Sequence, residues 1–449
     1  MEKLSRQVVL EISRRKQEPE WMRKLRLEAR EQFLRMEWPD WGPDLEELKQ
    51  AKLEYYIKPR REMVENWGKV PKEVREIFEK LGVPEVEREA LAGVGAQFDS
   101  EMVYRNLKER QRQQGIIYMG MEEAVRSERE VKYQGQRRKI KELVQEYFMS
   151  LVRPEDHKIA ALHAAVWSGG SFVLVPKGVR AELPIQSYFR FNAPGAGQFE
   201  HTLVLVDEAA ELHFIEGCSA PRYNVANLHA GGMEFYVGKN SKLKFSMVES
   251  WSKNMFNLNT KKVYVETGGL MEWVAGSFGS KVSMVYPATI LAGEGARVDY
   301  KGVSMAGEGQ NFDTGAKVIH LEKNTYSNLE MKSVVRGGGR VVSRSLVKIG
   351  KNAEGARSFV DCQALVLDED SRAESVPKVI VNNKRAEVGY EASVGKIDDK
   401  TIEYLRSRGL DERRARSLTV KGFAGGVASE MPLEYAGEMN KMIELEVVR

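Results

Sequence analysis

The feature that most limits the fold is a phrase that recurs about every 28 residues through the middle of the chain. Each copy ends an apolar segment with a polar or glycine-containing turn and then begins another apolar segment. The copies begin at Val206, Val237, Val265, Ala292, Leu321 and Ile349, so the intervals between them are nearly equal. A near-constant period of short strands is typical of a solenoid. A β-sandwich also has regular short strands, but its turns need not recur at one spacing, so we favour the solenoid.

Short alternating apolar segments without helical periodicity continue from about Ser168 to about Val388. The first six cover residues 172–175, 185–191, 202–206, 212–215, 233–237 and 243–248. We therefore predict a β-helix core over residues 161–395. A solenoid has open ends and strand edges, and these favour pairing with another chain.

The region before this core, residues 1–160, has mostly helical patterns. We expect one charged helical stretch over residues 11–35, divided at Pro19. A second helix is expected to begin at Pro71 and end near Gly82, and residues 122–151 are expected to be mostly helical.

The region after the core, residues 396–449, also returns to helical patterns. We expect a helix over residues 398–407, a second helix that Asp411 caps and that ends near Gly422, and a third over residues 431–445. Their apolar faces are explained equally well by packing on the solenoid end and by docking of a partner.

Charge and motif content exclude several classes of function. The 69 basic and 65 acidic residues interleave, so no basic tract predicts a nucleic-acid partner. The sequence contains no Walker loop, HExxH or GxSxG motif. The first residues lack the apolar core of a signal peptide, and no apolar run reaches the roughly 18 residues of a membrane span. We expect a cytoplasmic protein with no membrane segment.

Cys362 is the first candidate for chemistry, because a thiolate is both a soft ligand for iron and an acceptor for sulfur. Alternation within its strand pattern puts its side chain on one face with Val360 and Ala364. Glu391 follows about one period further along the chain, and one solenoid turn could place the two side by side. The alternative, which the pattern alone favours, is a small buried cysteine and an unrelated surface charge.

Cys218 is the other cysteine, and Gly217 and Pro221 beside it indicate a turn or bulge at a strand end. The pair forms no CxxC motif, so reduced thiols are expected. An iron–sulfur cluster takes about four ligands, mostly thiolates, and two distant cysteines cannot supply them. Any cluster here is therefore under-ligated or shared between chains, which suits transient assembly better than permanent electron transfer.

The six histidines give no further site from sequence. His201, His213 and His320 fall on strand patterns, where a core or surface role is more common than ligation. His157, His163 and His229 have no partner that the sequence makes visible.

Six colinear segments carry a family resemblance. They are residues 95–104, residues 165–173 with 176–178, residues 188–192, residues 216–221, residues 315–320 and residues 432–436. Together they resemble the SufB scaffold subunits of the SUF iron–sulfur assembly system. The resemblance runs from about Gly82 to the C-terminus, and the segment Ala-Gln-Phe-Asp-Ser-Glu at 96–101 is similar to SufB rather than to its paralogue SufD.

The resemblance implies a right-handed parallel β-helix between a helical N-terminal region and C-terminal helices. It also implies that the C-terminal helices dock a SufC-like ABC ATPase, and that the β-helix edge pairs with a SufD-like paralogue or a second copy of the chain.

The resemblance further implies roles for individual residues. The family's interface cysteine matches Cys362, its nearby carboxylate matches Glu391, and the cysteine at the sulfur entry matches Cys218. Residues along the family's proposed sulfur path match Arg190, Asn192 and Trp251, with Lys261 as a looser match.

Two positions depart from the family pattern. Tyr390 stands where many relatives have a histidine, and a phenol with a pKa near 10 is a poor iron ligand at neutral pH. Glu249 stands where many relatives have glutamine, which adds a negative charge beside a path meant for an anionic persulfide.

We therefore expect a scaffold that receives persulfide sulfur from a donor protein at Cys218 and passes it to Cys362. Iron is expected at a dimer seam on Cys362 and Glu391, giving a transient iron–sulfur cluster, with ATPase and desulfurase activities in the partners. The sequence leaves involvement of a flavin open. One alternative is a SufD-like structural partner without its own cluster site. The other is a carbohydrate-active β-helix enzyme, but such an enzyme needs a pair of acidic residues that the sequence does not show.

Overall fold

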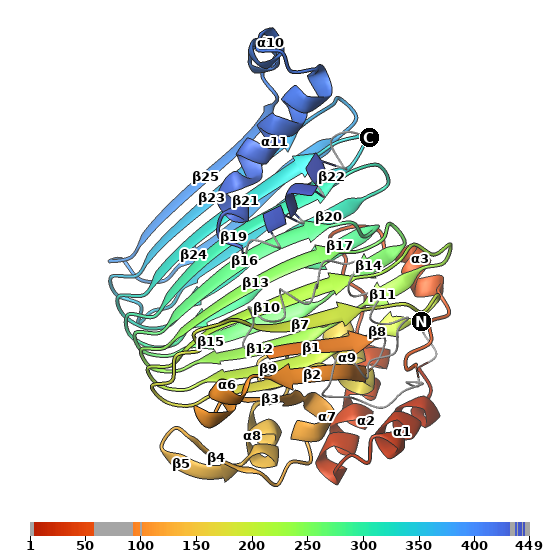
Figure 1. The fold of residues 1–449 in the computed structure, drawn as a ribbon, viewed down its shortest axis with the longest axis vertical. Helices are drawn as coiled ribbons and strands as arrows, with labels where there is room; N and C mark the ends of the chain where they lie inside the picture. Colours follow the sequence, from red (N-terminus) through yellow and green to blue (C-terminus); the bar gives the residue numbers. More distant parts are fainter. Residues whose placement is uncertain are drawn as a thin grey trace.

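The predicted solenoid is confirmed by the computed structural model of the chain, in which parallel strands stack along one long axis (Figure 1). The structure describes residues 4–57, 93–98, 101–431, 436–437, 439–441 and 443–444. The helix expected between Pro71 and Gly82 lies outside these residues. Within the described residues, no helix is long and apolar enough to cross a membrane.

Two large sheets form the walls of the solenoid. In spatial order the first contains β2 (Glu101–Leu107), β1 (Gly93–Phe98), β7 (Ile185–Arg190), β10 (Glu211–Ser219), β13 (Lys242–Ser250), β16 (Leu270–Phe278), β19 (Arg297–Ala306), β21 (Tyr326–Val335), β23 (Arg357–Val366) and β25 (Glu387–Lys396). The second contains β3 (Ile117–Gly120), β6 (Ser171–Val175), β9 (His201–Val206), β12 (Gly232–Val237), β15 (Thr260–Val265), β18 (Ala288–Leu291), β20 (Asn311–His320), β22 (Arg340–Ile349) and β24 (Arg372–Val381).

Four short strands extend the second sheet, namely β8 (Gly197–Gln198), β11 (Asn227–His229), β14 (Met255–Asn257) and β17 (Val282–Val285). The long strand β20 pairs with β17 through its first residues and with β18 through its last. The earlier turns therefore use two short strands where the later turns use one long strand.

The repeated phrase is one turn of the solenoid. Val206, Val237 and Val265 are Cα partners on neighbouring strands, so the first three copies lie in one column. The column continues through Leu291 and His320, each one residue before the start of the next copy. Since side chains alternate across each strand, this register stacks inward residues on inward residues.

Helices cover the first turns of the solenoid, and a further helical region packs against the outer face of its first sheet. The N-terminal helices are α1 (Arg6–Arg15), α2 (Glu20–Arg35), α3 (Glu46–Gln50), α6 (Glu109–Gln113), α7 (Met121–Ala124), α8 (Ile140–Tyr147) and α9 (Lys158–Val166). The C-terminal helices are α10 (Asp399–Ser407) and α11 (Glu412–Ala428), and residues 436–437, 439–441 and 443–444 are also helical. Pro19 separates α1 from α2 as expected.

The expected helix over residues 122–151 is wrong in its middle. A hairpin of β4 (Glu130–Tyr133) and β5 (Gln136–Lys139) lies there, and α8 follows it. Gln134 and Gly135 have φ of 49° and 78°, the positive values that a two-residue hairpin turn requires. This turn overrides the local helical pattern.

The second C-terminal helix begins as predicted, since the Asp411 side chain accepts from the Arg414 amide at 2.8 Å. Its predicted end near Gly422 is wrong, because α11 continues to Ala428. Ala424, Val427 and Ala428 are buried there against the outer face of the first sheet. That burial outweighs the low helix propensity of glycine.

A buried polar chain joins the N-terminal region to the solenoid. His163 contacts His201 through ring nitrogens 3.0 Å apart, and His201 contacts a Glu234 oxygen at 2.9 Å. The same carboxylate accepts the backbone amides of Met149, Leu151 and Val152 at 2.5, 2.6 and 2.8 Å. Glu234 is fully buried, so its charge depends on these donors.

We expect Glu234→Ala to lower the free energy of unfolding by about 3–5 kcal/mol, because it leaves several buried donors without an acceptor. Urea denaturation followed by circular dichroism measures the change. Glu208→Ala is the control, because that carboxylate pairs with Lys177 at the surface. Equal destabilisation by the two substitutions would show that the Glu234 carboxylate is not the acceptor on which these buried donors depend.

Candidate functional site

Cys218 lies on β10 and points into the solenoid, where it is 1% exposed. Its thiol is 3.7 Å from a Glu216 carboxylate oxygen two positions earlier on the same inward face. Phe189 and Glu249 are its Cα partners on the neighbouring strands. The strand end expected beside it from sequence is present, since β10 ends at Ser219.

A buried lysine lies among the acids next to this cysteine. The Lys261 ammonium is 3.4 Å from Glu249 and 3.5 Å from Glu216, and all three side chains are at most 2% exposed. The ammonium also contacts the Met247 sulfur. Glu249 further accepts the side-chain amides of Asn257 and Asn259, each at 2.8 Å. The extra negative charge noted at Glu249 is therefore compensated by a cation and two amides.

His229 extends this buried network toward the second sheet. One ring nitrogen is 2.5 Å from Glu200 and the other is 2.7 Å from the Asn257 oxygen. The Trp251 ring lies 4.6 Å from the imidazole, measured between ring centroids. Trp251 and Cys218 also belong to one apolar cluster. The interior around Cys218 therefore combines aromatic packing with several ionisable groups.

Burial dominates the protonation of these groups. It raises the pKa of Glu216 to about 7, although Lys261 opposes the shift. Burial and then the Glu216 charge raise the pKa of the Cys218 thiol well above its usual value. Burial lowers the pKa of Lys261, but Glu249 and Glu216 outweigh it, so the net shift is upward. The resting state is thus a neutral thiol facing a carboxyl group that titrates near neutrality.

Arg190 and Asn192 lie at the rim of this site. Arg190 is the Cα partner of Ser219, whose hydroxyl accepts its guanidinium at 2.9 Å. The Asn192 carbonyl accepts the Tyr223 hydroxyl at 2.7 Å, from the loop after β10. Cys218, Trp251 and Lys261 therefore lie in the interior of the early turns, whereas Arg190 shares the outward face of Ser219 beside them.

Cys362 lies on β23 and also points inward, on the predicted face with the buried Val360. The Tyr390 hydroxyl from β25 is 3.4 Å from its sulfur and 2.6 Å from the Ser375 hydroxyl. Burial raises the pKa of this thiol, and the hydrogen bond from Tyr390 opposes the shift. Tyr390 therefore acts as a hydrogen-bond donor to the sulfur.

Glu391 does not face Cys362. The register between β23 and β25 makes Asp361 the Cα partner of Glu391, and it makes Ala392 the partner of Cys362. Glu391 therefore points outward beside Asp361. Burial and then the Glu391 charge raise the pKa of Asp361. The thiol and the acid lie on adjacent strands but on opposite faces of the sheet.

Two inward columns connect the two cysteines. Along the first sheet, Cys362 continues the column of Glu216, Met247, Ala275, Gly302 and Met331. Cys218 belongs to the adjacent inward column, which continues through Glu249, Ser277, Ser304, Ser333 and Ala364. Five strand spacings of about 4.8 Å separate β10 from β23, or roughly 24 Å. The residues between are mainly small.

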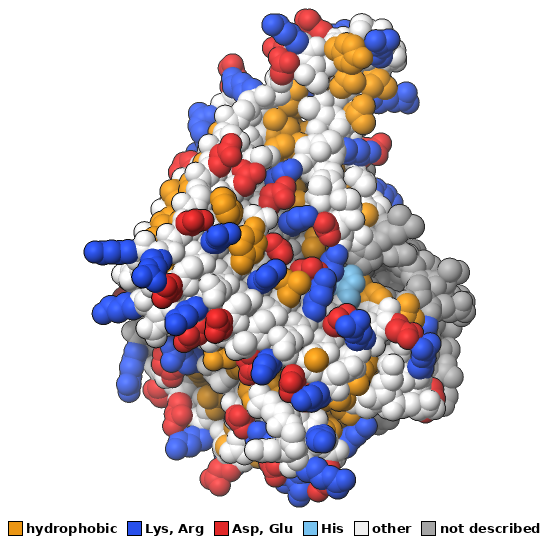
Figure 2. Space-filling view, turned by 90° about the vertical axis from the view of Figure 1, so that its left-hand side faces the viewer, with side chains coloured by type: hydrophobic (Ala, Val, Ile, Leu, Met, Phe, Trp, Pro, Cys, Tyr) orange, Lys and Arg blue, Asp and Glu red, His pale blue; other side chains and the backbone are white. Residues whose placement is uncertain are grey.

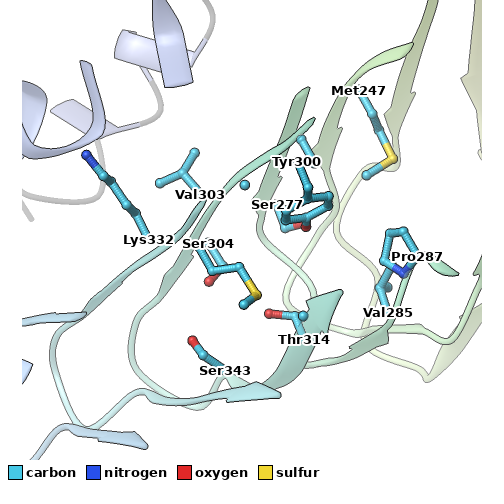
Figure 3. Close-up of a pocket in the computed structure, with 14 residues that line it drawn as sticks. Met247, Ser277, Val285, Pro287, Tyr300, Val303, Ser304, Thr314, Lys332 and Ser343 are labelled. Atoms are coloured by element: carbon cyan, nitrogen blue, oxygen red, sulfur yellow. The ribbon is translucent and has the colours of Figure 1, made fainter. Parts of the chain in front are cut away.

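A cavity of about 30 Å³ lies partway along these columns, enough for one or two water molecules. Met247, Ser277, Tyr300, Ser304, Thr314, Met331 and Ser343 are among its lining residues (Figure 3). Lys332 points away from the rest toward the C-terminal helix, where the Phe423 carbonyl accepts its ammonium at 3.1 Å. The interior between the cysteines is thus small-residue, hydroxyl-lined and not completely filled.

Sequence reasoning misses several residues of this site. It assigns no role to Glu216 or Glu200, and it finds no partner for His229. The signal that could have found them is the period itself, because Glu200, His229 and Asn257 follow one another at nearly one period. Within the described residues, no group of three or more His, Cys, Asp or Glu side chains is arranged to hold a metal ion.

Comparison with known proteins gives matches over nearly the whole chain. Residues 189–423 match the family model described as the SufBD core domain of SUF system FeS cluster assembly, and residues 10–187 match the SufBD protein N-terminal region. The chain is 42% identical over 444 residues to "Iron-sulfur cluster assembly protein SufB" of Bacillus subtilis, covering 99% of this chain and 93% of that protein. An iron-sulfur cluster assembly SufBD family protein of Staphylococcus haemolyticus gives the same identity and coverage.

We expect Glu216→Gln to flatten the pH dependence of stability. A carboxyl with a pKa of about 7 in the folded protein and 4.5 when exposed binds more protons when folded. The free energy of unfolding should therefore fall by about 3 kcal/mol as pH rises through this interval, and the glutamine variant should lack that fall.

Urea denaturation of both proteins at pH 5, 6, 7 and 8 measures the difference. Glu208→Gln is the control, because that carboxylate lies at the surface beside Lys177. Parallel profiles for the wild type and Glu216→Gln would show that this carboxyl does not titrate as described.

Proposed function

This chain belongs to the SufBD family of the SUF iron–sulfur cluster assembly system, and we propose that it is the scaffold on which a cluster is assembled. The observation that carries the proposal is the pair of inward columns that link Cys218 to Cys362 through small residues. In this proposal the chain binds sulfur and iron as substrates, and partner proteins supply the desulfurase and ATPase activities.

Cys218 is the entry point for sulfur in this proposal. Glu216, with its raised pKa of about 7, accepts the thiol proton across 3.7 Å. The thiolate then attacks the outer sulfur of a donor persulfide. The donor S–S bond breaks, the donor leaves as a thiolate, and Cys218 carries the persulfide, so no oxidant or reductant is consumed. Lys261 offsets the negative charge that the persulfide brings into the interior.

Transfer to Cys362 follows the interior columns. The roughly 24 Å between the two strands exceeds the reach of one cysteine side chain, so a small thiol must act as carrier along the columns. The carrier thiolate takes the outer sulfur and releases the Cys218 thiolate, and the Cys362 thiolate then takes that sulfur and releases the carrier thiolate, so no oxidant or reductant is consumed. Ala275, Gly302, Ser277 and Ser304 leave the space for this carrier, and the cavity lies on this route. Arg190 and Trp251 help to form the entry end of the route, as the family resemblance implies.

The open end of the solenoid is the proposed seam with a second chain. Val394 on β25 continues an inward column but is 55% exposed, because β25 is the last strand of the first sheet among the described residues. Val379 and Val381 on β24 are also exposed. A SufD-like paralogue or a second copy would cover this end. Cys362, one strand from the end, would then hold iron with ligands from both chains. Glu391, on the opposite face of the sheet, would join that iron only if pairing with the second chain turned β25.

The C-terminal helices are the proposed dock for a SufC-like ABC ATPase. Tyr404 on α10 and Leu418 on α11 are 57% and 50% exposed. Hydrophobic side chains gather at the upper end of the molecule, where Figure 1 places α10, α11 and β25 (Figure 2). Charges of both signs are mixed over the rest of that face.

The outward position of Glu391 favours a second candidate function. A chain whose thiol and acid do not meet could be a SufD-like structural partner that holds no cluster of its own. Copurification with both a SufC-like ATPase and a distinct SufB would support this candidate.

We expect Cys362→Ala to abolish the visible absorbance of an iron–sulfur cluster after anaerobic reconstitution with iron and sulfide. Cys218→Ala should keep that absorbance, because free sulfide bypasses the entry point, but should lose sulfur uptake from a persulfide donor. Equal cluster absorbance in wild type and Cys362→Ala would remove Cys362 from its proposed role and favour the SufD-like function.

We expect Ser304→Val to block transfer between the cysteines by filling the interior beside Gly302. After incubation with a persulfide donor, mass spectrometry of the two cysteine peptides should find the added sulfur on Cys218 but not on Cys362. Lys301→Met is the control, because Lys301 faces outward on the same strand and pairs with Glu430. Equal persulfide on Cys362 in both variants would show that sulfur takes another route.

A further inference from the structure

A large cavity lies outside the solenoid, away from both cysteines' interior columns. Its volume is about 850 Å³, within the range of small-molecule sites. Its walls are the segment after α2 (residues 36–41 and 45), the first residues of α9 with the two before them, and the outer faces of β15, β18 and β20. The cavity therefore joins the N-terminal region to the solenoid.

The walls are mainly apolar and aromatic. The apolar side chains are Met36, Trp38, Pro39, Trp41, Leu45, Ile159, Leu258, Met284, Tyr286, Ala288, Ile290, Ile319 and Leu346. Trp41 is 46% exposed, which is unusual for so large an apolar side chain. An apolar ligand bound in this cavity would bury aromatic surface that is otherwise exposed to water.

Two of the three lysines in the wall already have partners. The Lys158 ammonium donates to the backbone carbonyls of Phe33 and Met36 at 2.7 and 2.6 Å. Lys262 pairs with Asp156 at 2.6 Å. Both ammonium groups therefore serve the structure of the wall and are not free to bind a ligand.

Lys317 differs from the other two. Among the described residues it forms no ion pair, and its ammonium lies 4.8 Å from the centre of the Tyr286 ring. Asp313, the nearby acid on β20, accepts hydrogen bonds from Nε and Nη2 of Arg344 at 2.9 and 2.7 Å. Burial and then the neighbouring cations Lys262 and Arg344 lower the pKa of Lys317. An anion beside this ammonium would relieve both effects.

Asn259 also borders the cavity, but its side chain donates to Glu249 and Asn257 inside the solenoid and is therefore directed away from the cavity. The cavity thus combines an apolar body with one cation, Lys317, that has no ion-pair partner among the described residues. Glu37 and Asp40 also line the cavity at its exposed rim. Among the described residues, neither forms an ion pair with Lys317.

We propose that this cavity binds a small organic anion, with its acid group on Lys317 and its apolar or aromatic body against Trp38, Trp41 and Tyr286. The site is separate from cluster assembly and does not depend on the scaffold role. Its ligand class follows from charge complementarity and volume: one acid group on a compact hydrophobic body.

Two fluorescent probes of the same shape test the proposal on the full-length protein. One is 8-anilinonaphthalene-1-sulfonate, which carries an anion, and the other is the neutral N-phenyl-1-naphthylamine. We expect saturable binding of both. Lys317→Met should weaken the sulfonate about tenfold, a change of about 1.4 kcal/mol, and leave the neutral probe within about twofold. Trp41→Ala should weaken both probes.

Lys348→Met is the matched control, because Lys348 is an exposed lysine on the outer face of β22 that does not line the cavity. It should change neither affinity. Competition by dodecanoate or by naphthyl phosphate would assign the natural acid group to a carboxylate or a phosphate. The proposal is overturned if binding is not saturable, if neither competitor displaces the sulfonate, or if the Lys317 and Lys348 variants bind it equally.

Discussion

The parallel backbone ladder is the constraint on which the rest of this structure depends. Each strand hydrogen-bonds to the strand one turn before and one turn after it, so a residue's neighbours in space lie about one period away in the sequence. Once that register is set, it determines which side chains are neighbours on each face of the sheet. Both cysteines and the small residues between them take their positions from this ladder.

A β-helix interior is normally apolar, but this one holds several ionisable side chains near Cys218. Glu200, Glu216, Glu249, Lys261 and His229 are all buried there. Such charges persist only where they compensate one another, and the pairs Lys261–Glu249 and His229–Glu200 do so. Burial raises the pKa of Glu216, and Lys261, which Glu216 shares with Glu249, only partly opposes the shift. The interior near Cys218 therefore contains charged side chains, whereas the interior near Cys362 contains neutral hydroxyl groups.

The sequence allowed the solenoid, its strands and its flanking helices to be predicted because the period and the alternation are local signals. The positions of Glu200, His229 and Asn257 could have been connected through the same period. The relation between Cys362 and Glu391 could not be obtained this way, since Glu391 precedes the true partner of Cys362, Ala392, by a single position. A shift of one position along a strand reverses the face. The hairpin of β4 and β5 was missed because its turn outweighs the local helical pattern.

The register also determines which changes in chain length the fold can absorb. Along the first sheet Glu211 pairs with Lys242, and Lys242 pairs with Leu270 on the next strand. The number of residues from Glu211 to Lys242 differs from the number from Lys242 to Leu270, so the length of chain in one turn already varies. Insertions at the corners between strands leave the ladder unchanged. Loss of one residue within β19 would instead bring Lys301 or Val303 inward in place of Gly302 and close the interior at that layer. In evolution, length variation among relatives should therefore gather at the corners, while strand lengths between the two cysteines stay constant.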